Sequence, residues 1–207
     1  MPAKQDYDLP MEPEKLIVWR ETEYADGDYV KVEKPAPKTV IKSRKPAKET
    51  IVSNGIKYVK IPFKDKYIYV SSDYYKVGGV RKPLSLKEAQ RVARQHGAVL
   101  PTQEMVDAIW RHADLKLKPI PLQAGPLMTQ PVYYLKHNSL IERQINNRSY
   151  DLVAGHKKDI IRPQRQGRVT IYGWHRLDGV PIQPTSNVHD DDYDDYSNCL
   201  RLVKLQA

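Results

Sequence analysis

Three histidines in the C-terminal part of the chain have the types and surroundings that acid–base chemistry needs. His156, His175 and His189 lie in polar, turn-rich stretches, and Asp159 follows the first of them by three residues. A histidine titrates near neutral pH, so it can give or take a proton, and a nearby carboxylate can orient it or hold its charge. If the protein is an enzyme, we expect these four groups and Ser197 to form its catalytic site.

Other interpretations of the same residues remain open. Asp178-Gly179 is typical of a hairpin turn, which would leave His175 packed on a strand. Neither Ser197 nor Cys199 has the G-x-S-x-G surroundings of an activated nucleophile, so we expect Cys199 to be buried on a strand. His137 lies four residues before an isoleucine on a predicted helix and is expected to border the core.

The sequence gives no strong sign of a metal or cofactor. Five aspartates at 190–195 could bind a hard cation such as calcium, but they lack the glycine and terminal glutamate of an EF-hand loop. The chain has one cysteine, which excludes a disulfide framework and a multi-cysteine zinc site. We therefore predict no metal and no cofactor.

The net charge of +9 indicates a polyanionic partner without choosing one. The basic side chains that we expect to contact it are Lys157, Lys158, Arg162, Arg165 and Arg168. A nucleic acid, a bacterial cell envelope and an acidic neighbouring subunit all fit this charge. Fourteen tyrosines could stack on bases, but no helix-turn-helix, RRM or zinc-finger pattern is present.

The elements that must position these groups begin near residue 51. Alternating apolar residues at 56–61 and 67–70 predict a β-hairpin, and Ser85 with Glu88 forms a capping box for a helix over 85–96. Thr102 caps a second helix, and a third runs over about 129–146 with its buried side at Val132, Leu135, Ile141 and Ile145. Short apolar runs after residue 150 predict strands. We therefore expect one α+β domain over residues 51–207, with three helices and a C-terminal set of short antiparallel strands.

Residues 1–50 form a predicted extended arm. They contain six of the 16 prolines and divide into an acidic block, with eight acidic and three basic side chains in 1–30, and a basic block in 31–50. The one apolar cluster of the arm is Leu16, Ile17, Val18 and Trp19. Such a cluster is suited to lying in a groove or adding a strand to a sheet, so we expect it to bind other protein subunits.

Two classes of protein are disfavoured by the sequence. No apolar run approaches the roughly 18 residues that span a bilayer, and the first residues lack the pattern of a cleaved secretory signal. We expect the protein in a virion or, by another export route, at the cell envelope or outside the cell.

Several motifs occur in the order of a family of bacterial hypothetical proteins that the chain resembles. They are Leu100-Pro101-Thr102 with Met105-Val106-Asp107 and Lys116-Leu117-Lys118-Pro119, the turn from Val153 to Asp159, and the run Tyr172–Pro184 followed by Asp195-Tyr196-Ser197. The resemblance spans about residues 67–203. It implies work at the envelope, on peptidoglycan or a polysaccharide. Where the family shows Asp-Tyr-Ser-His-Gly, this chain has Asn198 and Cys199, and asparagine cannot shuttle a proton near neutral pH.

This departure and the arm together favour a non-enzymatic structural or assembly protein, such as a phage virion component built on a hydrolase-like domain. The first alternative is a hydrolase of the cell envelope that acts on peptidoglycan or polysaccharide. The second alternative is a nucleic-acid-binding protein.

Overall fold

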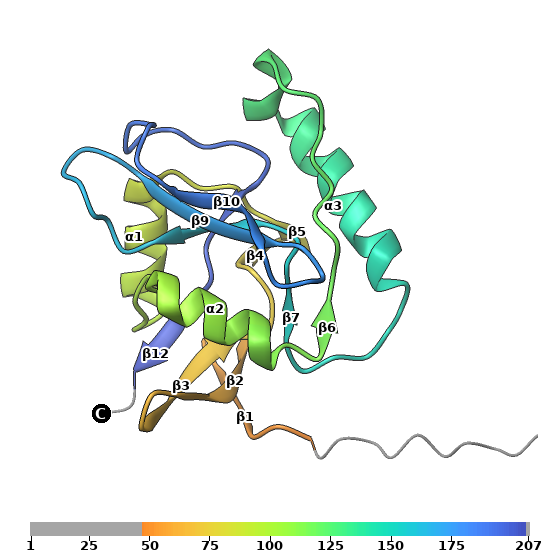
Figure 1. Cartoon of the computed structure of the whole chain (residues 1–207), viewed down its shortest axis with the longest axis vertical. Coiled ribbons are helices and arrows are strands. Elements are labelled where there is room, and N and C mark those ends of the chain that lie inside the picture. The colour runs from red at the N-terminus through yellow and green to blue at the C-terminus, as the bar shows by residue number, and fades with distance from the viewer. Residues whose placement is uncertain (1–46, 206–207) are drawn as a thin grey trace, which may run out of the picture. The chain divides into compact units, whose positions relative to one another are not determined.

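The computed structural model describes residues 47–205, and every structural statement below refers to them (Figure 1). Leu16, Ile17, Val18 and Trp19 lie outside the described residues, so their role in subunit binding stays a prediction. Among the described residues, no helix is long and apolar enough to cross a membrane.

The first sheet contains the predicted hairpin. Its spatial order is β1-β2-β3-β12, with every neighbouring pair antiparallel. The strands are β1 (Thr50–Ser53), β2 (Ile56–Phe63), β3 (Lys66–Ser71) and β12 (Val203–Leu205). Asn54 and Gly55 both have positive φ, which suits the tight turn between β1 and β2. One face of the hairpin is buried at Val59, Ile61, Ile68 and Val70.

The second sheet follows the order β10-β9-β8-β11, in which only the β8–β11 pair is parallel. Its strands are β8 (Lys158–Ile161), β9 (Thr170–His175), β10 (Pro181–Ser186) and β11 (Asn198–Cys199). The hairpin turn at Asp178-Gly179 is confirmed, and His175 and Trp174 lie buried on β9. Sequence patterns miss β10, because Pro181 and Pro184 are tolerated only where a strand lies at the edge of a sheet.

Two short ribbons complete the strands. The first pairs β4 (Lys76–Val77) with β5 (Val80–Arg81), and the second pairs β6 (Leu115–Lys116) with β7 (Val153–Ala154) in parallel. The second ribbon brings the chain after the second helix beside the turn that carries His156.

Both predicted capping signals begin helices. Helix α1 (Leu86–Gln95) has the full capping box of Ser85 and Glu88, and Thr102 caps α2 (Gln103–His112). Helix α2 lies between the two sheets (Figure 1). Met105 and Ile109 pack on the first sheet, whereas Val106 packs with Tyr172 of the second sheet. This double contact fixes the helix that carries Asp107.

Helix α3 (Pro131–Ile145) begins with a proline in its first turn, as predicted, after a 3-10 turn, η1 (Pro126–Thr129). The prediction that Val132 and Leu135 face inward is wrong, because their exposed fractions are 56% and 57%. The buried stripe contains His137, Ile141 and Ile145. Val132 and Leu135 lie roughly 180° and 120° around the axis from the centre of that stripe, so a helix that packs through it must expose them.

Candidate functional site

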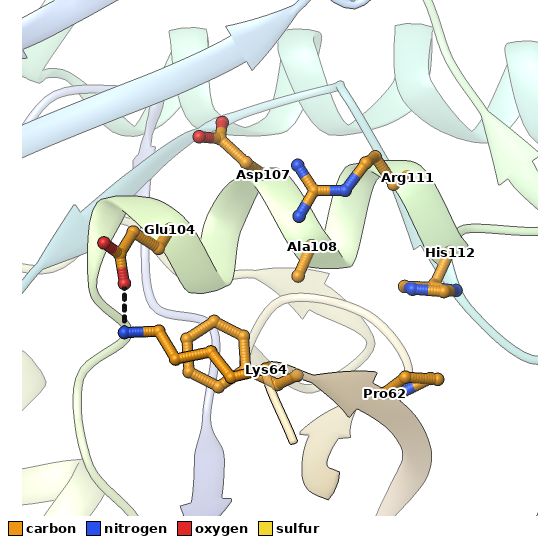
Figure 2. Close-up of a pocket in the computed structure, with 8 residues that line it drawn as sticks. Pro62, Lys64, Glu104, Asp107, Ala108, Arg111 and His112 are labelled. Atoms are coloured by element: carbon orange, nitrogen blue, oxygen red, sulfur yellow. Dashed lines mark ion pairs between the residues drawn. The ribbon is translucent and has the colours of Figure 1, made fainter. Parts of the chain in front are cut away.

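A cavity of about 390 Å³ lies beside α2 and the end of β2. Figure 2 shows its lining residues, with an ion pair between Lys64 and Glu104. The two charged atoms are 2.9 Å apart, and both side chains are about two-thirds exposed, so solvent screens this pair. Asp107 also lines the cavity, and it is the carboxylate there that neighbouring side chains hold in place.

Two side chains of β9 fix the carboxylate of Asp107. His175 Nε2 lies 3.1 Å from Asp107 Oδ1, and the Tyr172 hydroxyl donates to the same oxygen at 2.8 Å. The Trp110 ring stacks on His175 at 5.7 Å. Burial lowers the pKa of His175, and Asp107 opposes this effect. A neutral His175 can donate from Nε2 to Asp107, so the pair can hold one proton at the edge of the cavity.

Asp159 is buried near His175. It accepts a hydrogen bond from the Tyr74 hydroxyl at 2.8 Å, and burial raises its pKa to about 7, although Arg201 opposes the rise. A side chain at Gly173 would begin 3.4 Å from Asp159 Oδ2 and 3.6 Å from His175 Cε1. The structure therefore places Asp159 and His175 close to the same glycine, but of these three residues only Asp107 lines the cavity.

His156 belongs to a separate buried network. Its Nε2 lies 3.2 Å from Arg81 Nε and 3.1 Å from Asp73 Oδ1, and its ring packs edge-on against Tyr74 at 4.9 Å. Burial lowers the pKa of His156 to about 3 despite the carboxylate, so the ring is neutral at physiological pH. Tyr74 is the only link between His156 and Asp159 that these contacts define.

Arg81 is the centre of that network. Its fully buried guanidinium bonds Asp73 at 2.5 and 3.0 Å, Glu142 at 2.6 Å and Asn138 at 3.0 Å. His156, Arg81 and Lys76 hold the pKa of Asp73 well below its usual range, against the effect of burial. These bonds tie the β4–β5 ribbon to α3 and account for the conformation of His156 without any ligand.

Ser197 and Cys199 are both fully buried. The backbone nitrogen and hydroxyl of Ser197 bond Asp195 Oδ1 at 2.7 and 2.5 Å, which is a local turn around one carboxylate. Cys199 is buried as predicted, and burial raises the pKa of its thiol to about 11. A buried protonated thiol is a poor nucleophile.

His189 lies apart from the other histidines. Its ring stacks on Tyr193 at 3.8 Å, and its carbonyl oxygen accepts from the backbone of Val169, just before β9 begins. His175 ends the same strand, roughly 20 Å away at the rise of an extended chain. The predicted cluster of histidines therefore does not converge.

His137 borders the core, as expected. It is fully buried, and its ring packs edge-on against Tyr196 at 4.9 Å and Trp174 at 6.0 Å. The backbone of Ile120 lies near the ring, but no contact has the geometry of a hydrogen bond to either ring nitrogen. Burial lowers the pKa of His137 to about 2.

The basic candidates divide into buried and exposed residues. The expectation that Lys157 can hold a polyanion needs correction, because the turn points its side chain inward, where the fully buried Nζ donates to the carbonyl oxygen of Tyr196. Lys158 is 12% exposed and lies 3.7 Å from Asp195. Arg162 and Arg165 are exposed, and Arg168 forms an ion pair with Asp190 at 2.7 Å.

The aspartates at 190–195 are engaged by other side chains. They pair with residues outside the cluster as follows: Asp190 with Arg168, Asp191 and Asp192 with Lys87, Asp194 with Tyr134, and Asp195 with Ser197. Within residues 47–205, no group of three or more His, Cys, Asp or Glu side chains could hold a metal ion.

A second cavity, of about 450 Å³, is an apolar groove. One wall is Lys118, Pro119 and Pro121, and the other is Arg176, Leu177, Asp178 and Ile182 at the β9–β10 turn. Leu177 is 50% exposed and Ile182 is 38% exposed. We call this cavity the strap groove, after the segment 118–121 that forms its first wall. A single basic side chain stands on each wall.

Sequence patterns miss the residues that organise these sites. Asp73 and Arg81 are charged residues in ordinary surroundings, and nothing in their spacing marks them for burial. Asp107 belongs to the Met105-Val106-Asp107 motif, which by itself assigns no role to the carboxylate. Asp73 and Arg81 are eight positions apart, but His156, Glu142 and His175, which bond to Asp73, Arg81 and Asp107, lie 83, 61 and 68 positions away, so the tertiary fold brings them together. No protein-family model, curated protein or solved structure matches this chain.

Proposed function

We propose that the protein is a non-enzymatic assembly component, of the kind found in a virion, whose N-terminal arm docks on neighbouring subunits. The supporting observation is the contrast between its interior and its surface. His156 Nε2, the Asp159 carboxylate and the Ser197 hydroxyl are buried and form hydrogen bonds with other residues of the domain. The strap groove, in contrast, presents apolar side chains to solvent, which is typical of a protein-binding surface.

Removal of the N-terminal arm tests this function. Sedimentation velocity on the full chain and on a variant lacking residues 1–46 measures self-association, and thermal unfolding by circular dichroism checks that the variant folds. We expect the full chain to associate in a concentration-dependent manner and the shortened chain to stay monomeric. Equal sedimentation of the two folded proteins would refute the proposal.

One observation favours a second candidate, an envelope hydrolase. Asp107 has a side chain that is 31% exposed, lines the 390 Å³ cavity, and is oriented by His175 and Tyr172. A carboxylate fixed in this manner can act as a general acid or base on a polysaccharide. Release of soluble fragments from peptidoglycan measures this activity, and Asp107→Asn should abolish it, because the amide keeps the shape and loses the proton.

A further inference from the structure

The strap groove has walls of fixed geometry. A side chain at Gly155 would begin 2.6 Å from the carbonyl oxygen of Leu117 and 3.1 Å from that of His175. Leu117 precedes the first wall and His175 precedes the second, so both walls start at one close backbone contact that only glycine permits. The groove is therefore formed in the folded domain before any partner arrives.

The second wall is also supported from beneath. Gly179, at the tip of the β9–β10 turn, lies with its Cβ position 3.0 Å from the Trp110 ring. Asp178 Oδ1 accepts from the backbone nitrogen of Val180 within the same turn. A preformed wall lowers the conformational entropy that a bound segment must overcome.

The chemistry of the groove favours an apolar segment flanked by acidic residues. Its lining includes two prolines, Leu177 and Ile182, whereas Lys118 and Arg176 supply one positive charge on each wall. Asp178 lies 3.4 Å from Arg176 in a pair that is more than half exposed, so solvent screens it and the guanidinium stays accessible. Burial of apolar side chains would provide affinity, and the two cations would set orientation.

The chain itself contains a segment of this kind. Leu16, Ile17, Val18 and Trp19 are consecutive, and Lys15 and Arg20 adjoin them. Glu12 and Glu14 lie beyond on one side and Glu21 and Glu23 on the other, so residues 12–23 carry four acidic and two basic side chains. Residues 20–47 separate this segment from Lys48, so it can reach up to about 100 Å from there at full extension. An arm of that reach can span from one subunit to the next.

We propose that the strap groove is the receptor for residues Leu16–Trp19 of a second copy of this chain. The inference rests on the proposed assembly function and names the surface at which it occurs. The acidic residues on the two sides of the segment pair with Lys118 and Arg176, one on each wall.

A labelled peptide tests the contact directly. The probe is residues 11–25 with a fluorescein label, and the receptor is the full chain carrying Trp19→Ala, so that its own segment competes less. Fluorescence anisotropy should show saturable binding. Leu177→Glu in the receptor should weaken it at least tenfold, whereas Val188→Glu, at a residue that is 70% exposed and does not line the groove, should change it less than twofold.

Charge reversal separates a true contact from a general change in the receptor. A peptide with Glu12→Lys, Glu14→Lys, Glu21→Lys and Glu23→Lys should bind the parent receptor at least fivefold more weakly. It should recover on a receptor with Lys118→Glu and Arg176→Glu, which in turn should bind the original peptide weakly. If recovery is absent, or if Leu177→Glu leaves peptide binding unchanged, the groove is not the receptor.

The outcome also distinguishes the two proposals. Loss of self-association on removal of residues 1–46, together with normal association of the full chain carrying Leu177→Glu, would overturn the groove assignment and leave the assembly function standing. Unchanged association in both variants would overturn both.

Discussion

The free energy of unfolding of the Asp159→Asn variant, relative to that of the parent, should be higher at neutral and alkaline pH than at acid pH. Asp159 is buried, and burial raises its pKa from 3.8 to about 7, with Arg201 opposing and Asp107 adding to the rise. Between these two values the unfolded chain releases the proton while the folded chain keeps it. The parent therefore loses stability as pH rises through this window, and the loss levels off above pH 7.

The size of the effect follows from the two pKa values. A difference of about 3 pH units, at about 1.4 kcal/mol per unit, gives about 4 kcal/mol. Asparagine cannot ionise, and its carbonyl oxygen can still accept from the Tyr74 hydroxyl, so Asp159→Asn removes the pH-dependent cost and keeps the contact. The free energy of unfolding of the variant minus that of the parent should rise by this amount between pH 4 and pH 8.

Urea denaturation at half-unit pH intervals measures this difference, and any constant offset from the substitution cancels. Asp65→Asn, in the exposed turn between β2 and β3, is the matched control and should show a flat difference. A profile for Asp159→Asn that varies by less than about 0.5 kcal/mol over this range would refute the reasoning, because a carboxyl group with that pKa must leave a larger signature.

Three further predictions follow from the contacts. Gly155→Ala should lower the free energy of unfolding by about 2–4 kcal/mol, because Gly155 has positive φ and its Cβ position lies 2.6 Å from a backbone oxygen. Gly167→Ala should lower it by about 1 kcal/mol, because Gly167 also has positive φ but has open space around it. Urea denaturation measures both values. Asp73→Ala should cost about 3–5 kcal/mol in the same assay, because it leaves a fully buried guanidinium without its main partner, and a cost below about 1 kcal/mol would contradict this account. If duplex DNA is the polyanionic partner, Arg162→Ser with Arg165→Ser should reduce the slope of log affinity against log salt by about 2, as expected for two lost phosphate contacts, and an unchanged slope would place the contact elsewhere.

The local signals in the sequence predict local structure well. Ser85 with Glu88 and Thr102 begin helices at the expected positions, and Asp178-Gly179 forms the expected turn. Each of these signals acts through hydrogen bonds within a few residues, so the neighbouring sequence is sufficient to specify it.

The burial of charged residues could not be predicted in the same manner. Arg81 and Lys157 are fully buried, although arginine and lysine are usually exposed. Each has a partner from a distant segment: Glu142 on α3 bonds to Arg81, in addition to the nearby Asp73, and the carbonyl oxygen of Tyr196, before β11, accepts from Lys157. The same limit explains Val132 and Leu135, because apolar character alone does not say which face of a helix meets the core.

The structure also shows which variant separates the two proposed functions. His175→Ala would remove a proton donor from Asp107, and it would also remove the ring on which Trp110 stacks. Trp110 supports Gly179 at the tip of one wall of the strap groove, so the same variant would disturb peptide binding. Asp107→Asn keeps both hydrogen-bond contacts to its carbonyl oxygen and leaves Trp110 in place. Loss of hydrolysis with unchanged peptide affinity in that variant would establish a catalytic site beside the groove, whereas absence of hydrolysis in the parent with intact peptide affinity would leave assembly as the function.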